Sequence, residues 1–307
     1  MTPLTPIYAV GMMRFSIFVL PFCALALFFT SCTSQPPLKC DVLVSIPPYI
    51  YFVNQLTSSE LTVCSLAPEG SNPHLYEPTP GQVTEAHLAK VWIRLSEGFE
   101  KKIYKSLQES KNAPLIVNLA EATDIPHLQE ESLPCCSHSH QGCSHNHHES
   151  RDLHIWLSLR LAKQQAQVIA QTLSSAFPER KEQIATNLIQ LLDSFEKADR
   201  EITELLLPYK GESILVSHAA FGYFCHDYGL EQIAIECEGK DPLPQNISSL
   251  LESAKHSQIR TVLIQSQYNN KGALMIAEQL KLPVHEIDPY SKDYLQNIKH
   301  LASMIAE

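Results

Sequence analysis

The middle of the chain carries two long helical patterns, and short β-rich segments flank them on both sides. From Ser158 to Phe177, apolar residues recur at intervals of three and four, Ser158 is a candidate N-cap, and Pro178 ends the pattern. A helix of about twenty residues spans about 30 Å, the width of a small domain. A second helical pattern follows at 179–207. We therefore expect helix rather than flexible linker between two lobes, and we assign the linking role to the first helix, 158–178.

Strand-like and helical segments alternate in both halves that flank these helices. The strand-like segments are 41–46, 61–66, 91–95 and 114–119 in the first half and 213–216, 233–236, 261–265 and 284–287 in the second. Such alternation predicts parallel sheets covered by helices. The expected fold class is α/β, with two lobes at 40–157 and 179–307. Each lobe would be a helix-covered, mainly parallel four-stranded sheet, and one long rigid helix would join them.

The first 32 residues have the features of an export signal. Arg14 precedes an apolar stretch at 15–29, which is shorter than the roughly 20 residues that a membrane-spanning helix needs. The small residues before Cys32 resemble a bacterial lipobox, in which the cysteine becomes lipidated; a plain secretory signal with an incidental cysteine is the alternative. The polar, proline-rich segment 33–39 predicts a tether. We expect an exported protein, periplasmic or at the cell surface, with a lipid anchor.

Nine cysteines in the chain agree with export, because an oxidising compartment tolerates them as disulfides. Cys40 and Cys64 fall on neighbouring predicted strands, and Cys225 and Cys237 bracket a short helix-to-strand connection. Both pairs are candidate disulfides, but the connectivity does not follow from the sequence.

Charge and motifs exclude several classes of function. The formal net charge is −10 and the basic residues are scattered, so we expect no nucleic-acid partner. The chain has no His-Glu-x-x-His motif and no Gly-x-Ser-x-Gly motif, so we expect no enzyme, and a secreted zinc hydrolase is a minor alternative. The other minor alternative is a surface adhesin-type lipoprotein. The acidic turn that contains Glu236 is expected to be solvated.

Three histidines and one aspartate lie at the ends of predicted elements, where parallel sheets place their ligand sites. His74 follows the second strand, His154 precedes the first long helix, and His218 follows a strand of the second half. Asp288 lies at the end of the last strand, where it could also cap the closing helix. Three imidazoles and a carboxylate would give Zn²⁺ a closed tetrahedral shell with no position for a catalytic water.

These positions resemble the four metal-ligand blocks of the zinc and manganese ABC-transporter solute-binding proteins, the ZnuA/TroA type, over about 40–307. The blocks read Pro-His74 with Tyr76-Glu77-Pro78, Asp152-Leu-His154-Ile-Trp156-Leu, His218-Ala-Ala-Phe-Gly-Tyr223-Phe and Asp288-Pro. The resemblance implies metal ligation by His74, His154, His218 and Asp288 between the two lobes. His218 stands where manganese-preferring members usually have Glu, which favours Zn²⁺, while Leu153 departs from the common Pro.

The segment 135–149 combines five histidines with three cysteines, a composition typical of metal binding rather than of a packed element. Its histidines are His138, His140, His145, His147 and His148. Zinc-type members of the family often carry such a loop, so we expect an auxiliary collector of metal.

The function that the resemblance implies is capture of Zn²⁺ outside the cytoplasmic membrane and its delivery to an ABC transporter permease. The protein would be a lipid-anchored monomer, and Mn²⁺ or Fe²⁺ is the alternative ligand.

Overall fold

The computed structural model describes residues 40–126, 128, 151–236, 251–252 and 254–307. All of them belong to one compact unit, Pro37–Glu307. The expected export signal with Cys32, the tether 33–39 and the histidine-rich segment 135–149 lie outside the described residues. Within the described part of the chain, no helix has both the length and the apolar character that a membrane crossing requires.

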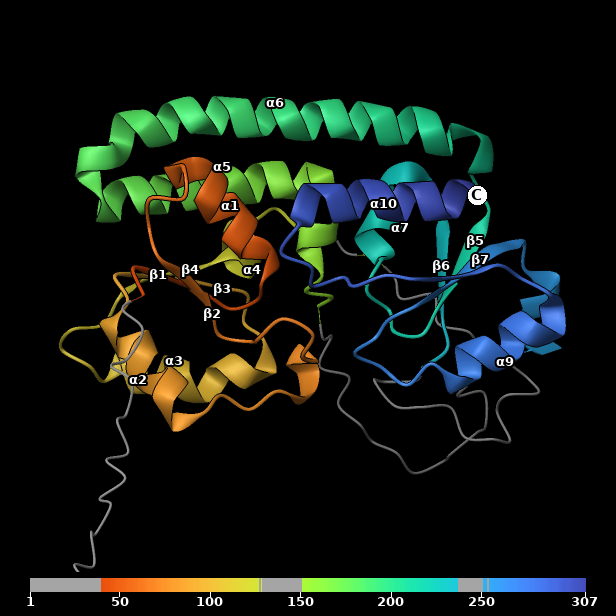
Figure 1. Ribbon diagram of the computed structural model, residues 1–307, viewed down its shortest axis with the longest axis horizontal. Coiled ribbons are helices and arrows are strands. Elements are labelled where there is room, and N and C mark those ends of the chain that lie inside the picture. Colours follow the sequence, from red (N-terminus) through yellow and green to blue (C-terminus); the bar gives the residue numbers. More distant parts are fainter. Residues whose placement is uncertain (1–39, 127, 129–150, 237–250, 253) are drawn as a thin grey trace, which may run out of the picture. The chain divides into compact units, whose positions relative to one another are not determined.

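The first lobe is a four-stranded parallel sheet in the order β2-β1-β3-β4. Its strands are β1 (Val42–Val44), β2 (Val63–Ser65), β3 (Val91–Arg94) and β4 (Leu115–Asn118). Its helices are α1 (Pro48–Thr57), α2 (Pro80–Leu88), α3 (Lys101–Gln108) and α4 (Leu119–Ala122) (Figure 1). The central strands β1 and β3 are buried along their whole length, as expected of a sheet with helices on its faces.

The second lobe repeats this design with a parallel sheet in the order β6-β5-β7-β8. Its strands are β5 (Ser213–Val216), β6 (Glu231–Ala234), β7 (Ile259–Ile264) and β8 (Val284–Glu286). Its described helices are α7 (Gly222–Tyr228), α9 (Lys271–Leu280) and α10 (Tyr294–Ala306). The expected α/β class with two four-stranded sheets is therefore confirmed.

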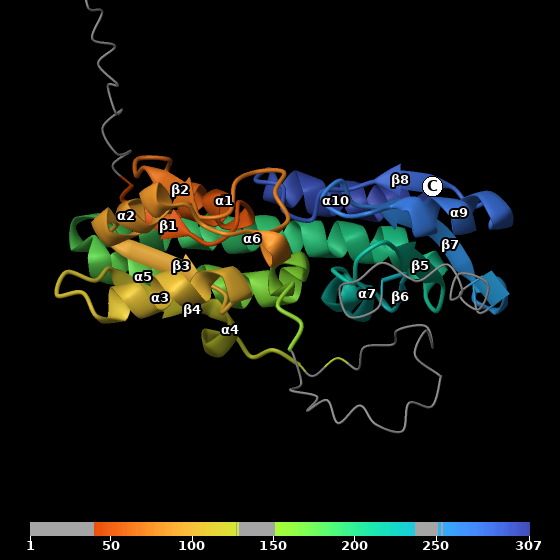
Figure 2. The same ribbon diagram turned by 90° about the horizontal axis from the view of Figure 1, so that it is seen from below.

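The helix that links the lobes is α6 (Lys181–Leu206), and not the predicted segment 158–178. That segment forms α5 (Leu159–Ala176), which packs on α1, α4, β3 and β4 of the first lobe. Helix α6 contacts α1 and α5 at one end and α7 and α10 at the other, as both views show (Figures 1 and 2). The 26 residues of α6 span about 39 Å and pack on both lobes, whereas the 18 residues of α5 span about 27 Å.

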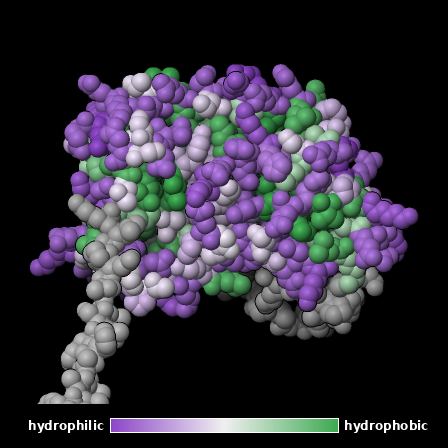
Figure 3. Space-filling model, viewed as in Figure 1, coloured by the Kyte–Doolittle hydropathy of each residue, from purple (hydrophilic) through white to green (hydrophobic). Residues whose placement is uncertain are grey.

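One hydrophobic core runs through both lobes and the helices between them. It extends from Val42 in β1 to Ile305 in α10. Within this core, Phe195 of α6 packs against Phe52 of α1 and Tyr294 of α10, with ring centroids 5.4 and 5.8 Å away, and the rings of Phe52 and Tyr294 lie 4.9 Å apart. Large apolar side chains that remain exposed are spread over several elements, and hydrophilic residues predominate on the face shown in Figure 3. The lobes are thus parts of one packed body.

The described cysteines include one disulfide pair and one free thiol. Cys40 and Cys64 form a disulfide, with their Cα atoms 5.9 Å apart, which joins the residue before β1 to β2. Cys225, the described member of the other candidate pair, is a free thiol on α7. Its side chain points into the core with 2% of the residue exposed, and burial raises the pKa of this thiol. Its proposed partner, Cys237, lies outside the described residues.

Candidate metal centre

His74 is held by a short turn that follows the first lobe's β2. The turn is the 3₁₀ helix Pro73–Leu75, and the Asn72 side chain caps it by accepting a hydrogen bond from the His74 amide at 2.9 Å. Pro73 favours the turn because its ring fixes φ at the first helical position. The His74 imidazole is 35% exposed, so this ligand candidate is the one most open to solvent.

His154 is fixed by its neighbour two residues earlier. The Asp152 Oδ1 atom accepts hydrogen bonds from the His154 amide at 2.8 Å and from the His154 Nδ1 at 2.7 Å. The imidazole is buried against the Trp156 ring, whose Nε1 donates to the Pro289 carbonyl at 2.8 Å. Trp156 thus ties this loop to the second lobe.

His218 lies just beyond the carboxyl end of β5 and is held by β7. Its amide donates to the Gln265 Oε1 at 2.7 Å, and the Gln265 Nε2 donates back to the His218 carbonyl at 3.2 Å. The Tyr268 ring stacks on the imidazole, with centroids 4.2 Å apart and planes within 10°. These contacts fix both the backbone and the ring plane of His218.

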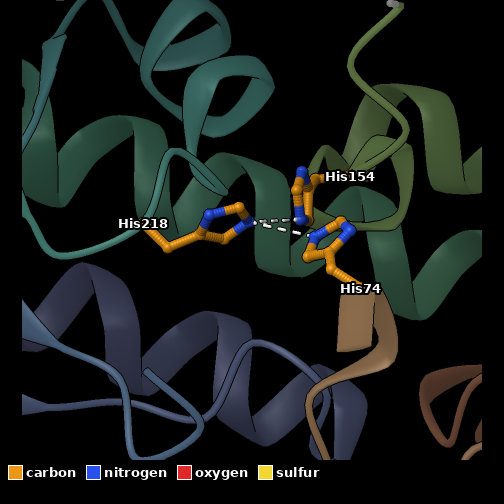
Figure 4. A group of neighbouring side chains, drawn as sticks. All are labelled: His74, His154 and His218. Carbon is orange, nitrogen blue, oxygen red and sulfur yellow. Dashed lines mark hydrogen bonds between the residues drawn. The ribbon is translucent and has the colours of Figure 1, made fainter. Parts of the chain in front are cut away.

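The three imidazoles converge on one point between the lobes (Figure 4). The His218 Nε2 lies 3.2 Å from the His74 Nε2 and 3.3 Å from the His154 Nε2. Zinc–nitrogen bonds of about 2.0–2.1 Å in a tetrahedron place two ligand nitrogens about 3.3–3.4 Å apart. These two distances fit a shared zinc ion, and the ligand atoms of all three histidines lie within 4.8 Å of one another.

A carboxylate lies behind each imidazole, on the side away from the centre. Asp152 contacts the His154 Nδ1, Glu236 contacts the His218 Nδ1, and the Glu97 Oε2 lies 3.8 Å from the His74 Nδ1. A carboxylate at Nδ1 favours the tautomer with the proton on that nitrogen, which leaves the Nε2 lone pair free for a metal. At His154 and His218 this turns the Nε2 lone pairs toward the centre, as ligation of a cation requires.

The pKa values of the groups at the centre shift in different directions. Burial, followed by repulsion from the neighbouring His154 and His218, lowers the pKa of His74 to about 3. Burial also lowers the pKa of His218. For His154, burial acts in the same direction, but the charge and hydrogen bond of Asp152 outweigh it and raise the pKa. Burial raises the pKa of Glu97 to about 7.

Asp288 does not join the three histidines among the described residues. Its Oδ1 accepts hydrogen bonds from the Gln267 Nε2 at 2.7 Å and from the Tyr290 amide at 2.8 Å. It does not cap the closing helix either, because α10 begins at Tyr294. Ligation of metal by Asp288 stays a prediction.

Three functional side chains, those of Glu97, Glu236 and Tyr290, were not expected from the sequence. Glu236 was expected to be solvated, but its side chain is 12% exposed and its carboxylate contacts His218. Its position could have indicated this contact: Glu236 is the second residue after β6, His218 is the second residue after β5, and the two strands are neighbours in the sheet. The hydroxyl of Tyr290 also reaches the centre, 3.3 Å from the His154 Nε2, and no pattern in the sequence pointed to it.

Comparison with known proteins gives a family and relatives. The model of the family described as "Zinc-uptake complex component A periplasmic" matches residues 42–307. A putative metal-binding protein of Chlamydia muridarum is 26% identical over 272 residues, which is 88% of this chain and 92% of the relative. The zinc-binding lipoprotein AdcA of Streptococcus pneumoniae R6 is also 26% identical, over 91% of this chain and 55% of AdcA.

Solved structures share the same fold. The crystal structure of ZnuA is 30% identical, with a TM-score of 0.76 over 88% of this chain and 98% of ZnuA. The periplasmic zinc-binding protein TroA of Treponema pallidum, 17% identical, has a TM-score of 0.71 over 88% of this chain and 98% of TroA. With the family match and the three converging histidines, these similarities show that the chain belongs to the ZnuA family of periplasmic zinc-uptake components.

Proposed function

We propose that this protein captures Zn²⁺ with His74, His154 and His218 and delivers it to the permease of an ABC importer. Members of its family are extracytoplasmic solute-binding proteins of such importers and not enzymes. The observation that carries the proposal is the convergence of three Nε2 atoms at 3.2 and 3.3 Å, each imidazole with a carboxylate on its other side. Zinc is the cargo of this site.

The chemistry of the donors favours zinc over manganese. Imidazole nitrogen suits Zn²⁺, whereas Mn²⁺ prefers carboxylate and water oxygens in six-coordinate sites. The three nearest carboxylates, those of Glu97, Asp152 and Glu236, face the Nδ1 atoms and not the centre. Fe²⁺ and Mn²⁺ are therefore weaker candidates for this centre.

The surrounding segments complete the proposal. Export with lipidation of Cys32 would hold the protein at the outer side of the membrane, where it acts as a monomer. The histidines of 135–149 would collect zinc at lower affinity and pass it to the centre. Relatives named as zinc-binding proteins, AdcA among them, support zinc as the cargo.

The test is a competition titration of the mature protein with a zinc chelator. The variants are His218→Ala, deletion of 135–149, and His226→Ala as a control that removes an exposed imidazole from α7 in the same lobe. We expect one tight zinc equivalent in the wild type, in the deletion variant and in the control. His218→Ala should weaken it by more than the about 10–100-fold that loss of an outer partner costs. Loss of tight binding in the deletion variant alone would place the site in the loop and overturn the proposal.

A further inference from the structure

Tyr290 lies at the centre of the site, although it belongs to neither the histidine set nor the predicted ligands. It is 1% exposed, and its ring packs on Trp156 with centroids 5.4 Å apart. Its hydroxyl oxygen lies 3.3 Å from the His154 Nε2 and 3.4 Å from the His74 Nε2. The hydroxyl thus faces the same point as the imidazoles.

These distances match the edges of a zinc tetrahedron. Bonds of about 2.0–2.1 Å give ligand-to-ligand distances of about 3.3–3.4 Å. The two nitrogen–nitrogen distances are 3.2 and 3.3 Å, and the two distances from the Tyr290 oxygen are 3.3 and 3.4 Å. The Tyr290 oxygen therefore lies at a ligand-to-ligand distance from two of the three imidazole nitrogens.

Hydrogen bonding alone does not account for this arrangement. A tyrosine hydroxyl has one proton and can donate it to one acceptor at a time. Here three Nε2 atoms converge, and the carboxylates at the Nδ1 atoms of His154 and His218 favour the tautomers with unprotonated Nε2 in these two rings. The Tyr290 proton can serve one of these two nitrogens at a time, whereas a single cation can bind the three nitrogens and the oxygen together.

We propose that the Tyr290 oxygen is the fourth protein ligand of the bound metal, in place of the Asp288 carboxylate. The inference rests on the proposed function, because it assumes that the three histidines bind the cargo. On binding, a lone pair of the Tyr290 oxygen forms the metal–oxygen bond. The result is a closed site of three nitrogens and one oxygen, with no net change in oxidation state.

Two neighbours support this role. The Asp288 Oδ1 accepts from the Tyr290 amide, so Asp288 positions the tyrosine instead of reaching the centre itself. The Tyr268 hydroxyl lies 3.3 Å from the Tyr290 hydroxyl, and the Tyr268 ring stacks on His218. Tyr268 can donate a hydrogen bond to a metal-bound Tyr290 oxygen, as outer partners of metal ligands commonly do.

The experiment compares Tyr290→Phe, Asp288→Asn and His218→Ala with the wild type in two readouts. The first is zinc affinity by chelator competition. The second is the visible absorption spectrum of the Co²⁺-loaded protein, whose bands report the number and type of ligands. Tyr228→Phe is the matched control, because it removes one buried hydroxyl that bonds to Asp199, away from the site.

We expect Tyr290→Phe to lose at least about 10–100-fold in zinc affinity and to change the Co²⁺ spectrum. Asp288→Asn keeps an oxygen that accepts from the Tyr290 amide, so its Co²⁺ spectrum should stay that of the wild type. A wild-type spectrum and affinity in Tyr290→Phe, or an altered spectrum in Asp288→Asn, overturns the inference and leaves the histidine site intact. Tight zinc binding by His218→Ala would instead overturn the proposed function.

A crystal structure of the zinc-loaded wild type gives a result that does not depend on the variants folding. A distance of about 2.0–2.2 Å between zinc and the Tyr290 oxygen supports the inference. A distance beyond about 3 Å, with water or Asp288 at the fourth position, refutes it.

Discussion

Replacing Asp152 by Asn tests whether the carboxylates behind the imidazoles govern metal affinity. In the wild type, the Asp152 Oδ1 accepts from the His154 Nδ1 at 2.7 Å and from the His154 amide at 2.8 Å. Asn keeps the size and one acceptor but removes the charge, so the hydrogen bond to Nδ1 loses its charge assistance. Loss of such an outer partner costs about 10–100-fold in metal affinity, or about 1.4–2.7 kcal/mol.

Two measurements on Asp152→Asn check this magnitude. Chelator competition should show the 10–100-fold weaker zinc binding directly. Thermal unfolding at a fixed, saturating concentration of free zinc should show zinc-dependent stabilisation that is smaller by about 1.4–2.7 kcal/mol. Asp193→Asn, the same change of charge on the exposed face of α6, is the control and should bind zinc as the wild type does. Wild-type affinity in Asp152→Asn would refute the idea that these carboxylates orient and activate the imidazoles.

Three further predictions concern stability. The pKa of His74 is about 3 in the folded protein and 6.5 in the unfolded chain, so between these two pH values only the unfolded state binds this proton. The free energy of unfolding of the metal-free protein should therefore decrease as the pH falls from 6.5 to about 3, as measured by denaturant titration. Replacing Cys40 and Cys64 together by Ser opens a loop with a sequence separation of 24 and should lower the free energy of unfolding by about 2–4 kcal/mol, measured by urea unfolding. Phe195→Ala removes the fully buried ring between α1 and α10 and should cost about 3–5 kcal/mol in the same assay, whereas a loss below about 1 kcal/mol would contradict the shared core.

The sequence predicted those parts of the fold that depend on residues close together in the chain. The buried run of β3 is almost wholly apolar, and the Ser158 side chain caps α5 by accepting from the Leu161 amide, as the sequence indicated. The strand β6 lies two residues earlier than its predicted segment, because pairing with β5 and not apolar composition decides its bounds. The linking role of α6 likewise depends on packing at both of its ends.

In the metal centre, too, some residues could be predicted from local sequence and others could not. His74, His154 and His218 were identifiable because each lies at the end of an element. The roles of Glu97 and Tyr290 depend on contacts between distant parts of the chain: Tyr290 reaches His74 across a sequence separation of 216 residues. Neither residue lies in a motif that specifies its partner, so only the folded arrangement reveals it.

The core shared by the lobes bears on how fast zinc can leave. Pulling the lobes apart would expose that core, and each 200 Å² of apolar surface would cost about 5 kcal/mol. His74, in contrast, stands on a three-residue turn, and the adjacent Leu75 is 82% exposed. We expect the residence time of the cargo to be set by the motion of this turn, so that a receiver which displaces residues 73–75 would accelerate dissociation without separating the lobes.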